Sequence, residues 1–146
     1  MSSHRAYQMY AHITWHTWER VGCIDTDAVQ DIRSALVSAS KATGIRVLQH
    51  NELADHVHLL LSFSPRHRLC DFLRQVKSVA SFRAGRRVTG AVKWARGYYV
   101  ATYHKKDLPK VANYIARQHE RHPDLIPKQS KRLLNAHQGF PKSGWE

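Results

Sequence analysis

An α+β fold, in which helices pack on an antiparallel sheet, is predicted by two kinds of periodicity in this sequence. Short segments rich in aromatic and β-branched residues have the composition of strands. Two longer segments repeat an apolar residue every three or four positions, which is the spacing of an amphipathic helix. All of them lie within 146 residues, a length that suits one domain with a single core.

The first predicted strand spans residues 10–18, where aromatic and β-branched side chains predominate. A helix is predicted next, because the Asp-Thr-Asp run at residues 25–27 offers N-caps and Gly44 is a typical C-terminal stop. The apolar residues of this helix recur at helical spacing: Ala28, Val29, Ile32, Ala35, Leu36 and Ala39.

Two consecutive strands follow this helix. Residues 45–53 form the second predicted strand, with Ile45, Val47 and Leu48 as candidate buried positions. After a short turn, residues 56–63 form the third strand, in which alternate side chains face opposite ways. One face is entirely apolar and carries Val57, Leu59, Leu61 and Phe63. The other face carries His56, His58, Leu60 and Ser62.

The second half of the chain supplies another helix and strand. The helix is predicted over residues 69–82, with an inward face made of Leu69, Phe72, Leu73, Val76 and Val79. Residues 83–97 are basic and expected to be irregular, with Gly85, Gly90 and Gly97 as breakers. The last strand is predicted over residues 97–102.

A third helix is predicted to begin at Asp107 as N-cap, with Pro109 in its first turn and with Val111, Ala112 and Ile115 toward the core. The first six elements therefore follow the β-α-β-β-α-β order of a ferredoxin-like fold with an antiparallel sheet. The third helix, which carries Tyr114, is an addition to that fold.

Composition favours a polyanion as partner. The chain has a net charge of +12 with its histidines neutral, and 42% of its residues are hydrophobic, as in globular proteins. No apolar run approaches the roughly 20 residues that span a bilayer, and no secretory signal is recognisable, so we expect a cytoplasmic, nucleoid-associated protein. Cys23 and Cys70 give neither a disulfide framework nor a zinc-ribbon spacing.

Two units are expected: a catalytic domain over residues 1–122 and a basic C-terminal tail over residues 123–146. The tail contains Lys128, Lys131, Arg132 and Lys142. We expect it to be extended or to dock on another subunit.

The pair His56 and His58 is the main candidate for metal binding. Alternate residues of a strand share a face and lie about 7 Å apart, so the two imidazoles offer half of a metal site. The alternative is a pair of strand histidines with satisfied hydrogen bonds. The amide oxygen of Gln118 is a candidate third ligand, and two nitrogens with one neutral oxygen suit Mg²⁺ or Mn²⁺.

Tyr114 is the candidate nucleophile. If its segment is helical, Tyr114 and Gln118 lie one turn apart on one face. A phenol ionises at about pH 10, so attack on phosphorus needs an activating group such as a metal ion. The alternative is a helix tyrosine whose ring anchors in the core.

Basic residues interleaved with aromatic residues suit single-stranded nucleic acid, whose bases stack while its phosphates are neutralised. The aromatic residues in question are Trp94, Tyr98 and Tyr99. The candidate DNA-binding residues are Lys77, Arg83, Arg86, Arg87, Lys93 and Arg96. The alternative is a solvated lysine on a helix followed by a mobile basic loop.

In their order and spacing, these motifs resemble the single-tyrosine transposases of the His-hydrophobe-His superfamily, namely the insertion-sequence-200-like and REP-associated tyrosine transposases. The resemblance covers roughly residues 10–118. It rests on the motifs at residues 12–15 (HITW), 55–60 (DHVHLL), 75–78 (QVKS), 94–100 (WARGYYV) and 114–118 (YIARQ).

This resemblance implies a metal-dependent endonuclease and strand transferase that acts on single-stranded DNA, usually at hairpins, through a 5′-phosphotyrosine link. It implies His56 and His58 as the metal-binding pair, Tyr114 as the nucleophile and Gln118 as the third ligand. It also implies a homodimer, and it leaves open whether the tyrosine helix completes the histidine site of its own subunit or that of the other.

The chain departs from the family pattern at three places. Ala54 stands where the family often has proline, and residues 102–105 stand where a small residue is common. His119 and His122 lie near Gln118 and are alternative third ligands. Two other functions stay open. One is a regulator that binds DNA without cutting it, and the other is a metal-dependent phosphodiesterase that uses water as its nucleophile.

Overall fold

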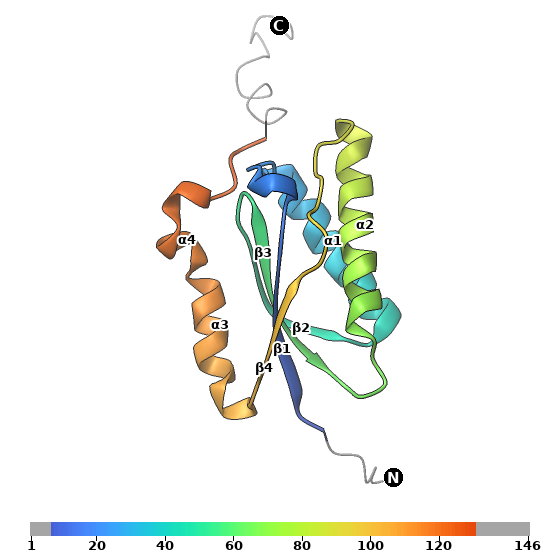
Figure 1. The fold of residues 1–146 in the computed structure, drawn as a ribbon, viewed down its shortest axis with the longest axis vertical. Helices are drawn as coiled ribbons and strands as arrows, with labels where there is room; N and C mark the ends of the chain where they lie inside the picture. Colours follow the sequence, from blue (N-terminus) through green and yellow to red (C-terminus); the bar gives the residue numbers. More distant parts are fainter. Residues whose placement is uncertain (1–6, 131–146) are drawn as a thin grey trace, which may run out of the picture.

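The computed structural model describes residues 7–130, which form a four-stranded antiparallel sheet with helices on both faces (Figure 1). The strands are β1 (Met9–His16), β2 (Arg46–Glu52), β3 (His56–Phe63) and β4 (Tyr99–Tyr103). The helices are α1 (Thr26–Thr43), α2 (Leu69–Arg87), α3 (Leu108–Ala116) and α4 (Gln118–Arg121), with short 3₁₀ turns at Trp18–Arg20, Lys105–Asp107 and Pro123–Leu125. The strand order β2-β3-β1-β4 confirms the predicted ferredoxin-like fold.

Helix α1 begins and ends as its sequence predicts. The side chain of Asp25 accepts a hydrogen bond from the Ala28 N–H at 2.9 Å, which caps the first turn. Gly44 ends the helix with φ +83°, a left-handed conformation that favours glycine. The predicted apolar positions of α1 are all buried.

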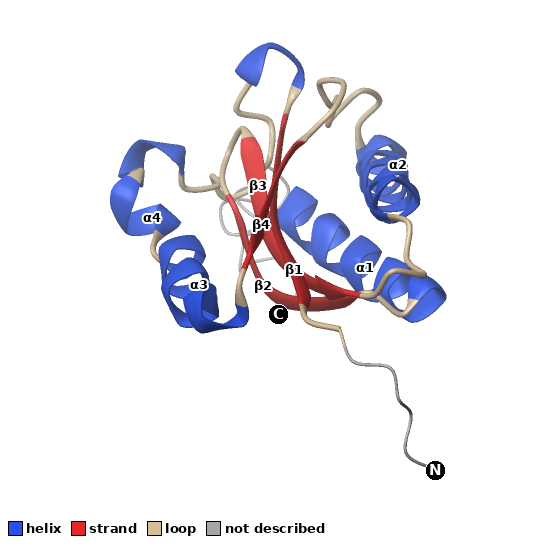
Figure 2. Cartoon of the chain, turned by 60° about the horizontal axis from the view of Figure 1, so that its bottom comes forward, coloured by secondary structure: helices blue, strands red, loops and turns tan. Residues whose placement is uncertain are grey.

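The main core lies between the sheet and the pair α1 and α2. Figure 2 shows these two helices on one face of the sheet, with α3 and α4 on the other. The strands contribute buried side chains that alternate along β1 and β3: Ala11, Ile13, Trp15, Val57, Leu59 and Leu61. Because successive side chains of a strand point to opposite faces, the residues between these positions point toward the sheet face that α3 covers.

Helix α2 is longer than predicted, because it continues through Gly85 to Arg87. The expectation of irregular structure from residue 83 is wrong for this stretch. Ala80 and Ala84 stay buried in the main core, and the guanidinium of Arg87 pairs with the buried carboxylate of Asp31 on α1. Packing against α1 thus outweighs the weak helix propensity of one glycine.

Strand β2 corrects a second detail. Leu48, a candidate buried residue, is exposed, because the register between β2 and β3 shifts at a bulge between Val47 and Gln49. Ile45 is fully buried and Val47 packs against the core.

Helix α3 packs on the sheet face opposite α1 and α2. Val111 and Ile115 form a second apolar cluster with Leu60 of β3. Pro109 lies in the first turn as predicted, whereas Asp107 makes no side-chain cap. The helix ends at Ala116, so Gln118 begins a separate short helix rather than continuing that of Tyr114.

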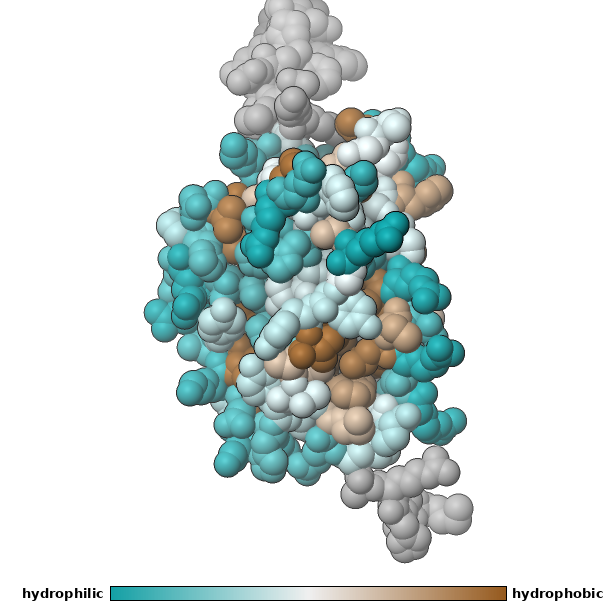
Figure 3. Space-filling model, in the orientation of Figure 1, coloured by the Kyte–Doolittle hydropathy of each residue, from teal (hydrophilic) through white to brown (hydrophobic). Residues whose placement is uncertain are grey.

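One face of the molecule is mainly hydrophilic (Figure 3). In Figure 3, hydrophilic residues cover most of the face seen in Figure 1, with an apolar patch near its middle. Within residues 7–130, no helix has the length and hydropathy needed to cross a membrane.

The first part of the expected tail packs on its own chain. The carbonyls of Leu125 and Lys128 accept hydrogen bonds from the N–H groups of Ala54 and Thr26, at 2.7 and 3.0 Å. The other cations of the expected tail, Lys131, Arg132 and Lys142, lie outside the described residues.

Candidate active site

The pairing of β1 with β3 brings several polar side chains together on the sheet face that α3 covers (Figure 2). His16 lies opposite His56, Thr14 opposite His58 and His12 opposite Leu60. Because alternate residues share a face, His12, His16, His56 and His58 all lie on the same side of the sheet. Residues more than forty positions apart in the sequence therefore meet at one place.

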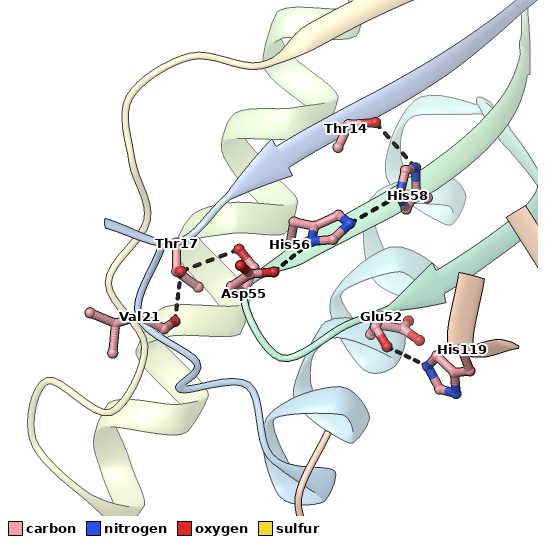
Figure 4. A network of polar contacts seen from close by, with 8 residues as sticks. All are labelled: Thr14, Thr17, Val21, Glu52, Asp55, His56, His58 and His119. Carbon is pink, nitrogen blue, oxygen red and sulfur yellow. Dashed lines mark hydrogen bonds and ion pairs between the residues drawn. The ribbon is translucent and has the colours of Figure 1, made fainter. Parts of the chain in front are cut away.

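The side chains of His56 and His58 converge. Their Nε2 atoms lie 3.1 Å apart, although the residues are separated by one position of an extended strand. On the far side of its ring, His56 Nδ1 donates to Asp55 Oδ1 at 2.6 Å, as Figure 4 shows. This carboxylate fixes the His56 proton on Nδ1, so His56 Nε2 carries the lone pair that accepts from His58 Nε2 and that a metal would engage instead.

The turn before this pair is held in place by backbone and side-chain contacts. Thr17 Oγ1 donates to the carbonyls of Val21 and Asp55, at 2.7 and 3.2 Å (Figure 4). The Ala54 N–H donates to the Leu125 carbonyl, a bond that a proline at this position would lack. The departure from the family pattern at Ala54 therefore provides a tether to the segment after α4.

His58 is supported by β1 rather than by a carboxylate. His12 Nε2 lies 2.9 Å from His58 Nδ1, and Thr14 Oγ1 lies 3.3 Å from it. Burial, followed by the neighbouring His56 and His12, lowers the pKa of His58 to about 3. Burial also lowers the pKa of His12. Both rings are neutral at neutral pH, the state in which an imidazole binds a metal or accepts a hydrogen bond.

These donors fit a divalent cation. Adjacent ligands of an octahedral ion with bonds of about 2.1 Å lie about 3 Å apart, which matches the separation of the two Nε2 atoms. Among residues 7–130, no cluster of three or more His, Cys, Asp or Glu side chains forms a metal site by itself. Any ion held here would need further oxygen ligands.

Tyr114 lies beside the histidines of its own chain. Its ring centroid is 6.0 Å from that of His58 and 5.9 Å from that of His12. The side chain is 39% exposed, so it is not anchored in the core. The guanidinium carbon of Arg121, on α4, lies 4.9 Å from the centroid of the tyrosine ring.

Gln118 lies near Tyr114 but belongs to a different helix, because α3 ends at Ala116 and α4 begins at Gln118. Its side chain is buried, and Nε2 donates to the Tyr114 carbonyl at 3.0 Å. His119 Nε2 lies 2.8 Å from the Glu52 carbonyl, which attaches α4 to the end of β2 (Figure 4). The ring of His122 is 6.4 Å from that of His56. Of the two alternative ligands, only His122 lies beside the pair.

Two of the six candidate DNA-binding residues have their charges engaged within the fold. Lys77 Nζ donates to the carbonyls of Ala95 and Gly97, at 3.0 and 3.3 Å, and so holds the segment before β4 against α2. Arg87 pairs with Asp31 through both terminal nitrogens. Both contacts stabilise the fold, and DNA binding by these two residues stays a prediction.

The other four candidates, Arg83, Arg86, Lys93 and Arg96, are exposed. Lys93 Nζ lies 4.7 Å from the ring centroid of Trp18. The backbone of Lys93 accepts a hydrogen bond from Trp18, and the Ala95 N–H donates to His16, so this segment extends the sheet beside β1. Basic and aromatic side chains thus lie next to the strand that carries the histidines.

The sheet, with α3 and its Tyr114 over the histidine face, forms a ferredoxin-like domain with an added helix. The chain superposes on the REP-associated tyrosine transposase bound to a REP hairpin with a TM-score of 0.66, over 97% of this chain and 89% of that one, at 16% identity. The chain belongs to the IS200-like transposase family, whose sequence model, described as "Transposase IS200 like", matches residues 5–118.

Two relatives agree with this assignment. The ISDra2 transposase TnpA of Deinococcus radiodurans is 24% identical over 122 residues, which are 79% of this chain and 87% of that protein. The transposase for insertion sequence element IS200 of Salmonella typhimurium is 30% identical over 108 residues, 68% of this chain and 66% of that protein. Membership of this family makes the chain a transposase, an enzyme that nicks and joins DNA.

Sequence reasoning missed three residues of the site. Asp55 directly precedes His56 in the DHVHLL motif. A carboxylate beside a metal-binding histidine commonly orients its ring, so this position could have indicated the role of Asp55. His12 lies in the HITW motif, but its contact with His58 depends on strand pairing. Arg121 follows Tyr114 by seven residues, a spacing typical of one helix face, so this spacing was an available signal.

Proposed function

We propose that the chain cuts and rejoins single-stranded DNA through a covalent link between Tyr114 and a 5′-phosphate, with a divalent cation at the histidine pair. The observation that carries this proposal is the position of the Tyr114 ring, 6.0 Å from the ring of His58. His58 Nε2 in turn lies 3.1 Å from His56 Nε2. A phenol and two converging imidazoles are the groups that such a reaction needs.

His56 and His58 would hold Mg²⁺ or Mn²⁺ through their Nε2 atoms, and the amide oxygen of Gln118 would be the third protein ligand. The bound ion would withdraw electron density from the non-bridging phosphate oxygens and stabilise the charge that develops there. Asp55 orients the His56 imidazole from behind.

Tyr114 supplies the nucleophile. The phenolic oxygen forms a bond to phosphorus, the bond from phosphorus to the 3′-oxygen breaks, and the phenol proton is lost to solvent while the leaving 3′-oxygen takes one up. The products are a phosphotyrosine ester at the 5′ end of the downstream strand and a free 3′-hydroxyl on the upstream strand. In the joining step a 3′-hydroxyl attacks the same phosphorus and releases Tyr114, so no ATP is required.

Arg121 assists Tyr114 with a fixed positive charge. Its guanidinium carbon is 4.9 Å from the tyrosine ring centroid. A cation in this place offers hydrogen-bond donors to the phosphate under attack.

The DNA is proposed to be a single strand that contains a hairpin, bound beside the exposed cations Arg83, Arg86, Lys93 and Arg96. The net charge of +12 and the hairpin held by the structural neighbour support this. Because Tyr114 lies beside the histidines of its own chain, we propose a site formed within one subunit, whether or not the protein is a homodimer.

The test uses labelled single-stranded oligonucleotides with hairpins, incubated with Mn²⁺ and separated on a denaturing gel. The wild-type chain should give a DNA band shifted by one covalently attached protein, and Tyr114→Phe should bind the same DNA without forming it. An adduct that persists in Tyr114→Phe rejects the assigned nucleophile.

The same gel separates the two rival functions. A regulator that only binds DNA would leave the oligonucleotide uncut. A phosphodiesterase that uses water would give cleaved DNA without attached protein. Either result from the wild-type chain would reject the proposed strand transfer.

A further inference from the structure

The two imidazoles of the histidine pair are supported differently. His56 Nδ1 meets the carboxylate of Asp55 at 2.6 Å, a strong acceptor that directly precedes it in the chain. His58 Nδ1 instead meets the imidazole of His12 at 2.9 Å and the hydroxyl of Thr14 at 3.3 Å, both from β1. Nothing in the proposed reaction requires a third histidine here, so the role of His12 needs a separate explanation.

A proton count supplies that explanation. A cation bound by His58 Nε2 takes up the lone pair of that nitrogen, so the neutral ring must carry its proton on Nδ1. That N–H is buried and needs an acceptor, since an unsatisfied buried donor costs free energy. His12 Nε2 is nearer to it than Thr14 Oγ1 and lies at the distance of a good hydrogen bond.

The packing around His12 holds its ring in place for this contact. The ring is buried and stacks on that of His58, with 5.1 Å between centroids and 29° between planes. Tyr103 of β4 and Tyr114 of α3 flank it, at centroid distances of 6.5 and 5.9 Å. Because β1 lies in the middle of the sheet, the backbone of His12 is paired on both sides.

From these contacts we infer that His12 is a positioning residue, whose Nε2 accepts the Nδ1–H of His58 and thereby keeps His58 Nε2 directed at the cation. The inference rests on the proposed metal site and deepens it. His12 itself touches neither DNA nor metal in this arrangement.

Matched substitutions test the inference. His12→Phe keeps a ring of similar size but removes the acceptor, whereas His12→Gln restores an acceptor through its amide oxygen. His16→Phe is the control, because His16 lies on the same strand and face, with its ring 5.4 Å from that of His56. Circular dichroism and thermal unfolding verify that each full-length variant is folded.

The first measurement is the Kd for Mn²⁺ by titration calorimetry. Removal of such a supporting hydrogen bond typically weakens metal binding by about 10–100-fold, which is the change expected for His12→Phe. His12→Gln should recover much of the affinity, and His16→Phe should bind as the wild-type chain does.

The second measurement is the tautomer of His58, read by long-range ¹H–¹⁵N NMR with Zn²⁺ as a diamagnetic probe. The wild-type ring should carry its proton on Nδ1, and the Nδ1–H signal should lose its hydrogen-bonded shift in His12→Phe but not in His16→Phe. A merely structural role of His12 would not alter this signal selectively.

The outcomes distinguish this inference from the proposed function. If the wild-type chain binds Mn²⁺ and His12→Phe binds it equally well with an unchanged His58 signal, the role of His12 is refuted and the metal site stands. If the wild-type chain does not bind Mn²⁺ at all, the metal site fails and the inference fails with it.

Discussion

The guanidinium of Arg121 lies over the ring of Tyr114, with 4.9 Å between Cζ and the ring centroid. The two residues belong to different helices, since α3 ends at Ala116 and α4 begins at Gln118. Arg117, between the two helices, has φ −95° and ψ 13°. A cation–π contact of this kind at an exposed site contributes about 0.5–1 kcal/mol.

Arg121→Ala should slow formation of the covalent DNA adduct by about 10–100-fold, because it removes a positive charge that stabilises the phosphate under attack. Arg121→Lys should retain part of the rate. The measurement is a single-turnover time course on a denaturing gel. Arg117→Ala is the control, since Arg117 pairs with Glu120 at 3.0 Å. Equal rates for Arg121→Ala and the wild-type chain would contradict the role of Arg121.

Asp55→Asn should raise the Kd for Mn²⁺ by about 10–100-fold, because this substitution removes the carboxylate that orients His56 from behind. Titration calorimetry measures the change. Asp71→Asn provides the control, since Asp71 makes surface ion pairs with Arg68 and Arg74 on α2. Unchanged affinity in Asp55→Asn would show that the carboxylate does not support a metal ligand.

The stability of the chain should fall as the pH falls below about 6.5, even without metal. His58 has a pKa of about 3 in the folded chain and an ordinary value of 6.5 when unfolded. Between these values the unfolded chain takes up a proton that the folded chain does not. The free energy of unfolding therefore decreases toward low pH, with a limiting slope of about 1.4 kcal/mol per pH unit for one such group.

Urea unfolding in the presence of a chelator checks this dependence. The range from about pH 6.5 to about pH 5 is informative, because carboxylates contribute mainly below it. His58→Gln removes the group, so its stability should depend less on pH in this range. Equal slopes for the variant and the wild-type chain would refute the contribution of His58.

Substitution of Arg83 and Arg86 should weaken DNA binding, whereas substitution of Arg87 should lower the stability of the fold. The double substitution of Arg83 and Arg86 by Ala should weaken single-stranded DNA binding, and reduce the slope of log K against log salt by about 0.7 for each phosphate that the protein no longer neutralises. Arg87→Ala should keep that slope but lower the free energy of unfolding by about 1–3 kcal/mol, because Asp31 is left without its partner.

Fluorescence anisotropy at several salt concentrations and urea unfolding measure the two effects. If Arg87→Ala reduces the salt slope as much as the double variant does, Arg87 binds DNA despite its ion pair with Asp31. If the double variant binds as the wild-type chain does, the proposed DNA surface is wrong.

Local patterns in the sequence predicted the helices and strands and which of their faces are apolar. Alternation along residues 56–63 predicted an apolar face toward one layer and His56 and His58 on the other, and the structure confirms both. Caps at Asp25 and Gly44 predicted the extent of α1. These features depend on residues within a few positions of one another in the sequence, so the spacing and backbone preferences of those residues are enough to predict them.

Only the tertiary structure decided which distant residues meet. The contact of His12 with His58 depends on the register between two strands. The continuation of α2 to Arg87 depends on packing against α1, which outweighed the local signal of Gly85. Such contacts are fixed by the total free energy of burial and pairing, because no short segment contains both partners.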